Sequence, residues 1–341
     1  MGQFSLATAI DRFGWFGVQQ VPLGWPRLLG PGAARGGRCV DAEAVNARAW
    51  LALWTVYVVW GSTYLGIELA GETIPPVFAA GVRFLLTGVL MAGFVAIRRG
   101  RTPFRVGRSE LASAVLVGVL LLGANAMLFV AERRVPIGLA SLLIASVPLW
   151  IVLLRTVTGD RPSRSALVGV ATGFAGIALL VRPGGQASFG GILLVLGSAS
   201  IWASGSFLSS KLPLPADAFV ATAIEMLAGG VMLLPLGLVL AGNESLSPAS
   251  WSGRSLAGLV YLILIGSLVG FTAYVWLLGH VPIGRVATYA YVNPVVAILL
   301  GVIFLGERVT WQIAVGATIV LASVALVIRN EAARVVEPFA E

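Results

Sequence analysis

Hydrophobic residues dominate the chain from Trp50 onward, in long runs separated by short polar stretches. Each run has about 17–25 residues, which is enough for an α-helix to cross a hydrocarbon core about 30 Å thick. The short connections leave no room for a soluble catalytic domain. The pattern predicts an all-α membrane protein with ten transmembrane helices, at residues 49–70, 74–97, 109–131, 136–155, 165–181, 189–210, 217–241, 255–278, 283–305 and 311–328.

Residues 1–48 differ from the rest, because they are rich in Gly, Pro and Arg and contain no apolar run long enough to span. They also lack the order of a signal peptide, which has a charged start, an apolar centre and a small-residue cleavage site. We expect a disordered N-terminal cytoplasmic tail, and a second cytoplasmic tail at residues 330–341. An interfacial segment around residues 13–25, or an upstream start codon that adds residues absent from the native protein, are the alternatives for the first stretch.

The composition also favours a membrane protein. Hydrophobic residues make up 58% of the chain and charged residues 11%, whereas soluble proteins carry about 25% charged residues. The single cysteine and the single histidine, Cys39 and His280, exclude an intramolecular disulfide and a multi-histidine metal site. No Walker-type phosphate loop is present, so we expect neither ATP as the energy source nor a cofactor.

The net charge of +8 comes from Arg residues that lie between the apolar segments. Nucleic-acid binding would place them on one soluble face, so the distribution argues against it. With the N-terminus inside, the inner segments hold 17 Arg or Lys residues and the outer segments hold 5. By the positive-inside rule, this bias predicts a cytoplasmic-membrane protein with both termini in the cytoplasm.

The two halves of the chain repeat each other. Several short motifs recur in the same order: Val135-Pro136-Ile137-Gly138 and Val281-Pro282-Ile283-Gly284, Pro148 and Pro294, Gly159-Asp160-Arg161 and Gly306-Glu307-Arg308, and Trp60-Gly61-Ser62 and Trp202-Ala203-Ser204. We divide the chain into repeats at 49–182 and 189–329. Because each has five spans, the second must enter the membrane from the opposite side, as in the inverted repeats of secondary transporters.

The order and spacing of further motifs resemble the EamA branch of the drug/metabolite transporter superfamily. The matching residues are Trp60-Gly61-Ser62-Thr63-Tyr64, Pro75-Pro76, Ala80-Gly81-Val82-Arg83-Phe84, Gly138-Leu139-Ala140-Ser141-Leu142 with Pro148, Tyr289-Ala290-Tyr291-Val292-Asn293-Pro294, and Leu305-Gly306-Glu307-Arg308. The resemblance covers residues 50–329. The first repeat departs from it, because Asp160 stands where the family usually has Glu.

The resemblance implies two inverted five-helix units around a central cavity, and transport of small polar metabolites or drugs. We therefore expect a secondary active transporter that works by alternating access in the lipid bilayer, with efflux rather than uptake, as a monomer or a homodimer. A membrane-embedded enzyme and a channel-like protein are the alternatives. No catalytic constellation at convincing spacing supports an enzyme, and no ring of pore charges supports a channel.

Two charged residues lie within predicted spans, where charge is expensive. Arg83 and Glu225 are 142 positions apart, the same offset as Trp60 and Trp202. Opposite charges at equivalent positions could face a shared cavity, pair with each other, bind a zwitterionic substrate, or snorkel to a helix end. Glu225 is the first candidate proton carrier if a proton is the coupling ion. Glu68 lies near the outer end of the first span and is expected at the solvated interface. Glu132 and His280 end the third and eighth spans at equivalent positions, and His280 is expected in the headgroup layer, with a proton relay as the alternative.

Uncharged polar and aromatic side chains inside the spans complete the candidate site. They either line the cavity or join helices to one another. The candidates are Trp60, Ser62, Thr63, Tyr64, Asn125, Trp202, Ser206, Tyr274, Tyr289, Tyr291 and Asn293. Pro148 and Pro294 cannot donate a backbone hydrogen bond, which frees the carbonyls of Ile144 and Ala290 and makes both prolines candidate hinges or gates.

Overall fold

The computed structural model of the chain describes residues 47–100, 102–159, 162–181, 187–281 and 283–334. The regular elements in these ranges are helices, and no strand occurs among them. Residues 1–46 and 335–341 of the expected tails, and Asp160 and Arg161 of the first Gly-Asp-Arg motif, lie outside the described residues.

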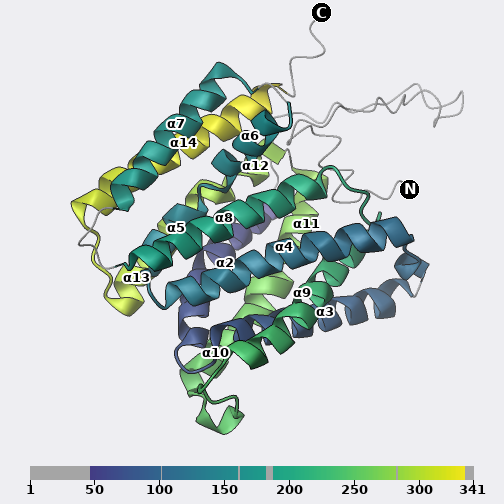
Figure 1. Cartoon of the computed structure of the whole chain (residues 1–341). Helices are drawn as coiled ribbons and strands as arrows, with labels where there is room; N and C mark the ends of the chain where they lie inside the picture. The colour runs from purple at the N-terminus through teal and green to yellow at the C-terminus, as the bar shows by residue number, and fades with distance from the viewer. Residues whose placement is uncertain (1–46, 101, 160–161, 182–186, 282, 335–341) are drawn as a thin grey trace, which may run out of the picture.

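Ten membrane passes account for the described helices (Figure 1). Eight stretches in the described part of the chain are long and apolar enough to cross a bilayer, and two shorter apolar helices complete the set. The elements are α2 (Ala47–Gly71), α3 (Pro76–Arg99), η2 (Thr102–Phe104), α4 (Arg108–Glu132), α5 (Ile137–Ile144), α6 (Val147–Val157), α7 (Arg164–Leu180), α8 (Phe189–Ser209), α9 (Ala218–Leu240), η3 (Pro248–Ser250), α10 (Gly253–Tyr261), η4 (Leu262–Val269), α11 (Gly270–His280), α12 (Ile283–Val286), α13 (Tyr289–Leu305) and α14 (Trp311–Arg334). The predicted all-α membrane fold is confirmed.

Two of the predicted spans are broken near their prolines. The fourth span divides at Ala145–Ser146, directly before Pro148, into α5 and α6. A proline in the first turn of α6 needs no hydrogen-bond donor there, so the break removes its conflict with helix geometry. The ninth span divides earlier, between α12 and α13, and Pro294 lies inside α13.

The eighth span contains a feature that the sequence pattern does not predict. Between α10 and α11, residues Leu262–Val269 form a π-helical segment, η4. Such wider turns in a helix are often found at functional sites. This segment carries Ser267, which faces one of the two charged residues within the spans, as described below.

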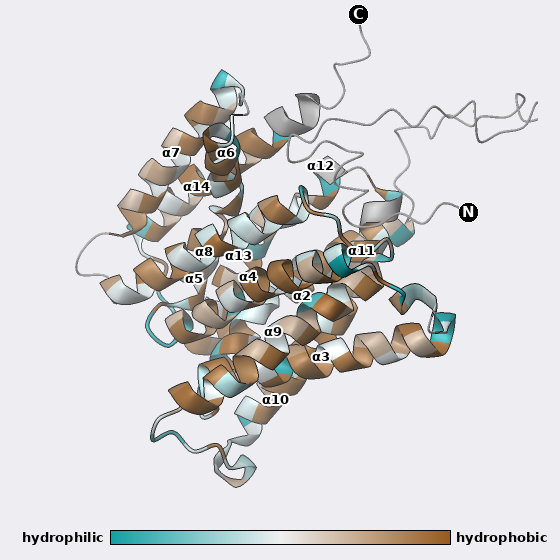
Figure 2. Ribbon diagram, turned by 45° about the vertical axis from the view of Figure 1, so that its right-hand side comes forward, coloured by the Kyte–Doolittle hydropathy of each residue, from teal (hydrophilic) through white to brown (hydrophobic). Residues whose placement is uncertain are grey.

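Hydrophobic residues cover the bodies of the helices, and hydrophilic residues gather at helix ends and connections (Figure 2). Large apolar side chains such as Leu51, Ile97 and Val239 are exposed, as expected for a surface solvated by lipid. We call the side with the start of α2 and the ends of α8 and α14 the terminal face. The opposite side, with the ends of α2, α4 and α13, is the loop face; it lies toward the lower left of Figure 1.

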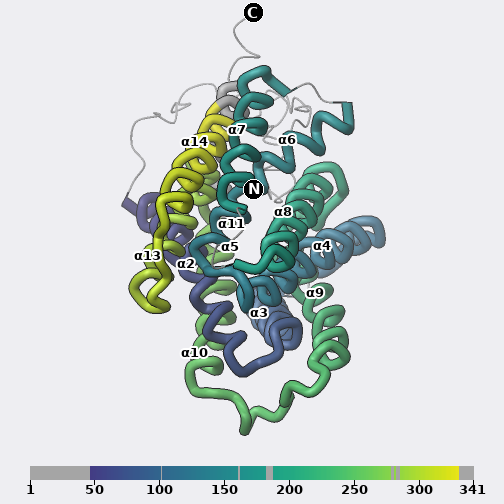
Figure 3. The backbone as a smooth tube through the Cα atoms, turned by 60° about the vertical axis from the view of Figure 1, so that its left-hand side comes forward, coloured from purple at the N-terminus to yellow at the C-terminus, as the bar shows by residue number. Residues whose placement is uncertain are grey.

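The pattern of helix contacts is unchanged when the two repeats are exchanged (Figures 1 and 3). The first span of one repeat packs on the third span of the other: α2 on α10, η4 and α11, and α8 on α4. The two second spans, α3 and α9, pack on each other, and so do the two fifth spans, α7 and α14. This exchange symmetry is what two inverted repeats require, and it places the central space between them.

Glycines let α3 and α9 approach closely. A Cβ atom at Gly230 would lie 2.4 Å from the backbone nitrogen of Leu85, and one at Gly81 would lie 2.7 Å from that of Leu234. Small residues at such crossings allow backbones to touch. The contact fixes the relative position of the helices that carry Arg83 and Glu225.

Candidate functional site

A cavity of about 280 Å³ lies between the two repeats. Eleven of the thirteen candidate binding residues line it, together with both candidate hinge prolines. These residues are Trp60, Thr63, Tyr64, Arg83, Asn125, Trp202, Ser206, Glu225, Tyr274, Tyr289, Asn293, Pro148 and Pro294.

The other two candidates lie away from the cavity lining. The Ser62 hydroxyl donates to the carbonyl of Val58 at 2.6 Å and lies 2.6 Å from the Tyr261 hydroxyl. This contact joins α2 to α10. Tyr291 packs against the hydrophobic core. Both side chains therefore match the helix-packing alternative.

Arg83 is 4% exposed and lies on the cavity wall. Its Nε donates to the Ser267 hydroxyl at 3.1 Å, and its Nη1 donates to the Asn125 side-chain oxygen at 3.4 Å. Ser267 belongs to the π-helical segment, so this irregular turn positions a polar partner for a buried cation. Neither partner carries a negative charge, so the guanidinium can still attract an anionic group.

Glu225 is 7% exposed and lines the same cavity from α9. Its Oε1 has no hydrogen-bond partner within the described ranges. Its backbone is held against α4, because a Cβ atom at Gly118 would lie 2.4 Å from the Glu225 carbonyl oxygen. Among the described residues, Glu225 and Arg83 form no ion pair, so direct pairing is not the arrangement of this conformation.

Aromatic rings form one wall of the cavity. The Trp60 ring lies 4.9 Å from the ring of Tyr274, 5.1 Å from that of Tyr289 and 5.4 Å from that of Phe271. The tilted and edge-on arrangements are those that aromatic pairs prefer. Trp202, at the equivalent place in the second repeat, also lines the cavity, but it has no aromatic neighbour among the rings described. The Trp202 face is therefore the more available of the two for stacking on a ligand.

Asn293, the residue before Pro294, makes a contact between two helices. The Asn293 amide nitrogen lies 3.2 Å from the carbonyl oxygens of both Tyr57 and Tyr289 and donates to them. Asn293 thus joins α13 to α2 at the cavity wall. Whether Pro148 and Pro294 act as hinges remains a prediction.

Sequence reasoning missed two buried charges. Arg155 lines the cavity at the end of α6 and is buried, although its place at a segment end suggested a loop residue. Glu132, which the sequence places at the end of the third span, is also buried. A charge at the end of a span looks the same in sequence whether it reaches water or turns inward, so only its packing separates the two cases.

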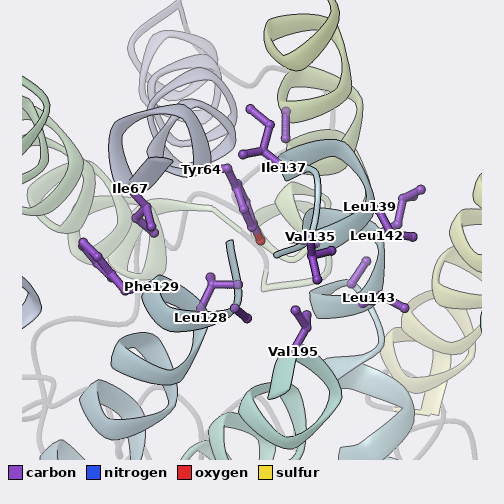
Figure 4. Close-up of a cluster of buried hydrophobic side chains, with 14 of the residues drawn as sticks. Tyr64, Ile67, Leu128, Phe129, Val135, Ile137, Leu139, Leu142, Leu143 and Val195 are labelled. Atoms are coloured by element: carbon purple, nitrogen blue, oxygen red, sulfur yellow. The ribbon is translucent and has the colours of Figure 1, made fainter. Parts of the chain in front are cut away.

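The cavity extends toward the terminal face and is closed toward the loop face. Its lining includes Arg155, Ser209 and Ile328, near the ends of α6, α8 and α14. At the other end, the part of the buried hydrophobic core that is drawn in Figure 4 fills the space between α2, α4, α5 and α8, with the Tyr64 side chain at its centre. We call this cluster the loop-face plug. Its labelled residues in Figure 4 are Tyr64, Ile67, Leu128, Phe129, Val135, Ile137, Leu139, Leu142, Leu143 and Val195.

Glu307, from the Gly-Glu-Arg motif of the second repeat, binds the first repeat beside the loop-face plug. Gly306 ends α13 in a left-handed conformation, with φ of 67°, which glycine adopts without steric cost. The Glu307 carboxylate then accepts hydrogen bonds from the backbone N–H groups of Ile137, at 2.6 Å, and Gly138, at 3.1 Å. A carboxylate at a helix N-terminus is favourable, because the free N–H groups and the helix dipole attract negative charge. We call this contact between the repeats the loop-face latch.

Arg133 ties the helix ends on the loop face together. Its guanidinium donates to the carbonyl oxygens of Gly71 and Ile74, and to both carboxylate oxygens of Glu244 at 2.8 and 2.9 Å. The hydrogen bond from Arg133 lowers the pKa of Glu244 below its ordinary value. The connection after α9 is thereby held against the end of α2.

Comparison with known proteins agrees with this architecture. The model of the EamA-like transporter family matches residues 48–182 and 189–329. The chain is 40% identical to an uncharacterized inner membrane transporter, YedA, of Escherichia coli K12, over 76% of this chain and 83% of that protein. It is 27% identical to a "probable amino-acid metabolite efflux pump" of Salmonella typhimurium LT2, over 78% of this chain and 90% of that one.

A solved crystal structure shares the fold. It superposes with a TM-score of 0.55 at 20% sequence identity, covering 82% of this chain and 96% of the other. The two matched stretches of the family model together take in nearly all of the described helices. This chain therefore belongs to the EamA-like transporter family of multi-pass membrane proteins.

Proposed function

We propose that this protein is a secondary active transporter that exports a small zwitterionic metabolite or drug by alternating access. The observation that carries the proposal is the cavity that equivalent residues of both repeats line, which extends toward one face and is closed toward the other by the loop-face plug. Inverted repeats that rock against each other around such a site can expose it to each side in turn.

The positive-inside bias supports a cytoplasmic position for the terminal face. In that orientation the described conformation is inward-facing, with the cavity reaching the cytoplasmic side and the loop-face plug closing the outer side. A substrate made in the cell could enter the cavity in this state. The relative named as an efflux pump supports the same direction.

The chemistry of the cavity indicates the substrate class. Arg83 offers a cation for an anionic group, Glu225 offers a carboxylate with an unpartnered oxygen for an ammonium group, and Trp202 offers an aromatic face. Binding sites for drug-sized ligands occupy about 300–1,000 Å³, and this cavity of about 280 Å³ lies just below that range, so it suits a compact molecule. Amino acids and their derivatives have this combination of size and charge.

Transport in proteoliposomes tests the proposal. Purified protein should show saturable counterflow of a zwitterionic amino acid, whereas a channel would give no counterflow and an enzyme would alter the substrate. We expect Arg83→Gln and Glu225→Gln each to raise KM or abolish counterflow. Ser62→Ala is the control, because Ser62 lies on the same helix wall but outside the cavity lining.

The charge-exchanged double variant Arg83→Glu with Glu225→Arg separates cavity chemistry from packing. It should restore counterflow only if the two groups act on opposite ends of one substrate. Normal transport by both single variants and the double variant would reject the substrate assignment. No counterflow with any small metabolite in the parent protein would reject the proposed function itself.

A further inference from the structure

Glu132 is a buried acid without a partner. It is the last residue of α4, at the loop face, and is 4% exposed. Neither carboxylate oxygen has a hydrogen-bond partner within the described residues. Buried polar groups in folded proteins are almost always satisfied, so an acid with two unsatisfied oxygens requires an explanation.

The charged surroundings of Glu132 come from three different elements. Glu68 on α2 and Glu307 after α13 repel a negative charge at this position, and Arg83 on α3 attracts one. The Tyr64 side chain on α2 also lies within electrostatic reach of Glu132. The hydrogen bonds of Arg83 run to Asn125 and Ser267 and not to Glu132, whose two oxygens stay without a partner among the described residues.

A proton fits this site better than a metal ion. A metal needs several ligands brought together around one point, and the described residues contain no group of three or more acidic, histidine or cysteine side chains that could hold one. A proton needs only one carboxylate oxygen. Protonation removes the charge, whose burial without a partner is strongly unfavourable.

The position of Glu132 connects that proton to the loop-face plug. Phe129, one turn earlier on α4, is buried in the plug, and Ala131, beside Glu132, is buried in the same hydrophobic core. Opening the loop face would separate α4 from α2 and α5 and admit water, which solvates the ionised carboxylate. Closing it would return the carboxyl to an apolar site, where the neutral acid is the stable form.

We propose that Glu132 is a proton-binding site that controls the loop face, with the proton bound when this face is closed and released when it opens. The O–H bond forms between a proton from the adjoining water and the Glu132 carboxylate, and it breaks in the reverse step. The terms closed and open refer to the two states of the proposed alternating access, so this inference rests on the proposed function. Occupancy of the site by a proton does not depend on which substrate is carried.

Infrared spectroscopy of the purified full-length protein tests the occupancy directly. At neutral pH we expect a carbonyl stretch from a protonated carboxylic acid, part of which disappears in Glu132→Gln. Glu72→Gln is the matched control, because Glu72 lies on the same face in an exposed ion pair with Arg254. An unchanged acid band in Glu132→Gln would overturn the proposal.

Cysteine accessibility tests the control of the face. Replacing Cys39 by Ser leaves a background without cysteine. Val135→Cys then reports on the plug, and Ser245→Cys, at an exposed site on the same face, corrects for the pH dependence of thiol reactivity. We expect the ratio of Val135→Cys to Ser245→Cys labelling by an impermeant maleimide to rise several-fold from acid to alkaline pH. With Glu132→Gln added, the ratio should stay low and independent of pH.

Further variants test whether a neighbouring acid or misfolding, instead of Glu132, explains the pH response. Glu132→Asp keeps a titratable carboxyl and should keep a pH response, even if Glu132→Gln proves too unstable to study. A response that survives in Glu132→Gln, or that disappears in Glu68→Gln instead, would overturn the assignment. Neither readout needs substrate, so they can succeed while counterflow fails, or fail while counterflow succeeds.

Discussion

The carboxylate of Glu307, in the second repeat, accepts the backbone N–H of Ile137, in the first, at 2.6 Å. The acid of a short motif after the ninth span thus caps the first helix of the fourth. The contact crosses between the two units that alternating access would move apart, on the side where the cavity is closed. The motif therefore ends α13 and also forms part of the loop-face latch.

Loss of the latch charge should loosen the loop face. Glu307→Gln replaces a charge-assisted acceptor with a neutral one, and hydrogen bonds to charged groups contribute about 1.5–3 kcal/mol. We expect a lower thermal unfolding temperature and faster maleimide labelling of Val135→Cys from the loop face. The control is Glu110→Gln, which removes an acid that accepts the N–H of Gly107 at 3.0 Å within one repeat. It should reduce stability without faster labelling, and equal labelling in both variants would contradict the latch.

Gly301 supplies the space that the latch occupies. A Cβ atom there would lie 2.4 Å from Oε2 of Glu307. Gly301→Ala should displace the carboxylate and reproduce the faster labelling of Glu307→Gln while the charge remains. Gly93→Ala, on α3, would meet no atom within 4 Å and is the control. Labelling of Gly301→Ala at the parent rate would show that the carboxylate can move without opening the face.

The spans and most of the cavity follow from simple sequence rules. Long apolar runs cannot be soluble, and a charge inside such a run must find a polar space, so the positions of Arg83 and Glu225 within their spans already indicate a polar cavity. The repeated offset of 142 residues identifies Trp60 and Trp202 as equivalent wall positions. These inferences succeed because each depends on one residue type and its depth in the membrane.

Features that depend on which way a side chain turns could not be predicted. Glu132 and Arg155 stand at span ends, where a charge usually reaches water, and both turn inward. The π-helical segment that brings Ser267 to Arg83 lies within a long apolar run and has no distinctive sequence pattern. The sequence indicated that the Glu307 motif is repeated. It could not indicate that Glu307 binds the backbone of Ile137, because Ile137 is 170 positions away and the packing of the two repeats brings the residues together.

Because of the ion pair between Arg133 and Glu244, the stability of the protein should depend on pH in the acid range. Because Arg133 lowers the pKa of Glu244, the pair contributes stability at pH values above the ordinary pKa, and this contribution is lost as pH falls through the lowered value, below about pH 4. The Glu244 side chain is 45% exposed, so solvent screens the pair and its contribution is at most about 1 kcal/mol. Thermal unfolding of the parent and of Glu244→Gln should converge in acid. A constant difference between them across that range would contradict the assignment.

The two equivalent tryptophans should respond differently to truncation. Trp60 is partly buried and packs against Phe271, Tyr274 and Tyr289, so Trp60→Ala should lower the free energy of unfolding by up to about 3–5 kcal/mol, the range for fully buried Phe or Trp. Trp202 lines the cavity without such ring contacts among the described residues, so Trp202→Ala should change stability less and raise the KM for counterflow more. Trp202→Phe keeps an aromatic face and should recover part of the affinity. Thermal unfolding of each variant, measured with and without substrate, separates the two effects. If Trp202→Ala instead lost stability as Trp60→Ala does while its KM stayed unchanged, the Trp202 ring would be a packing element and the stacking surface would have to lie elsewhere on the cavity wall.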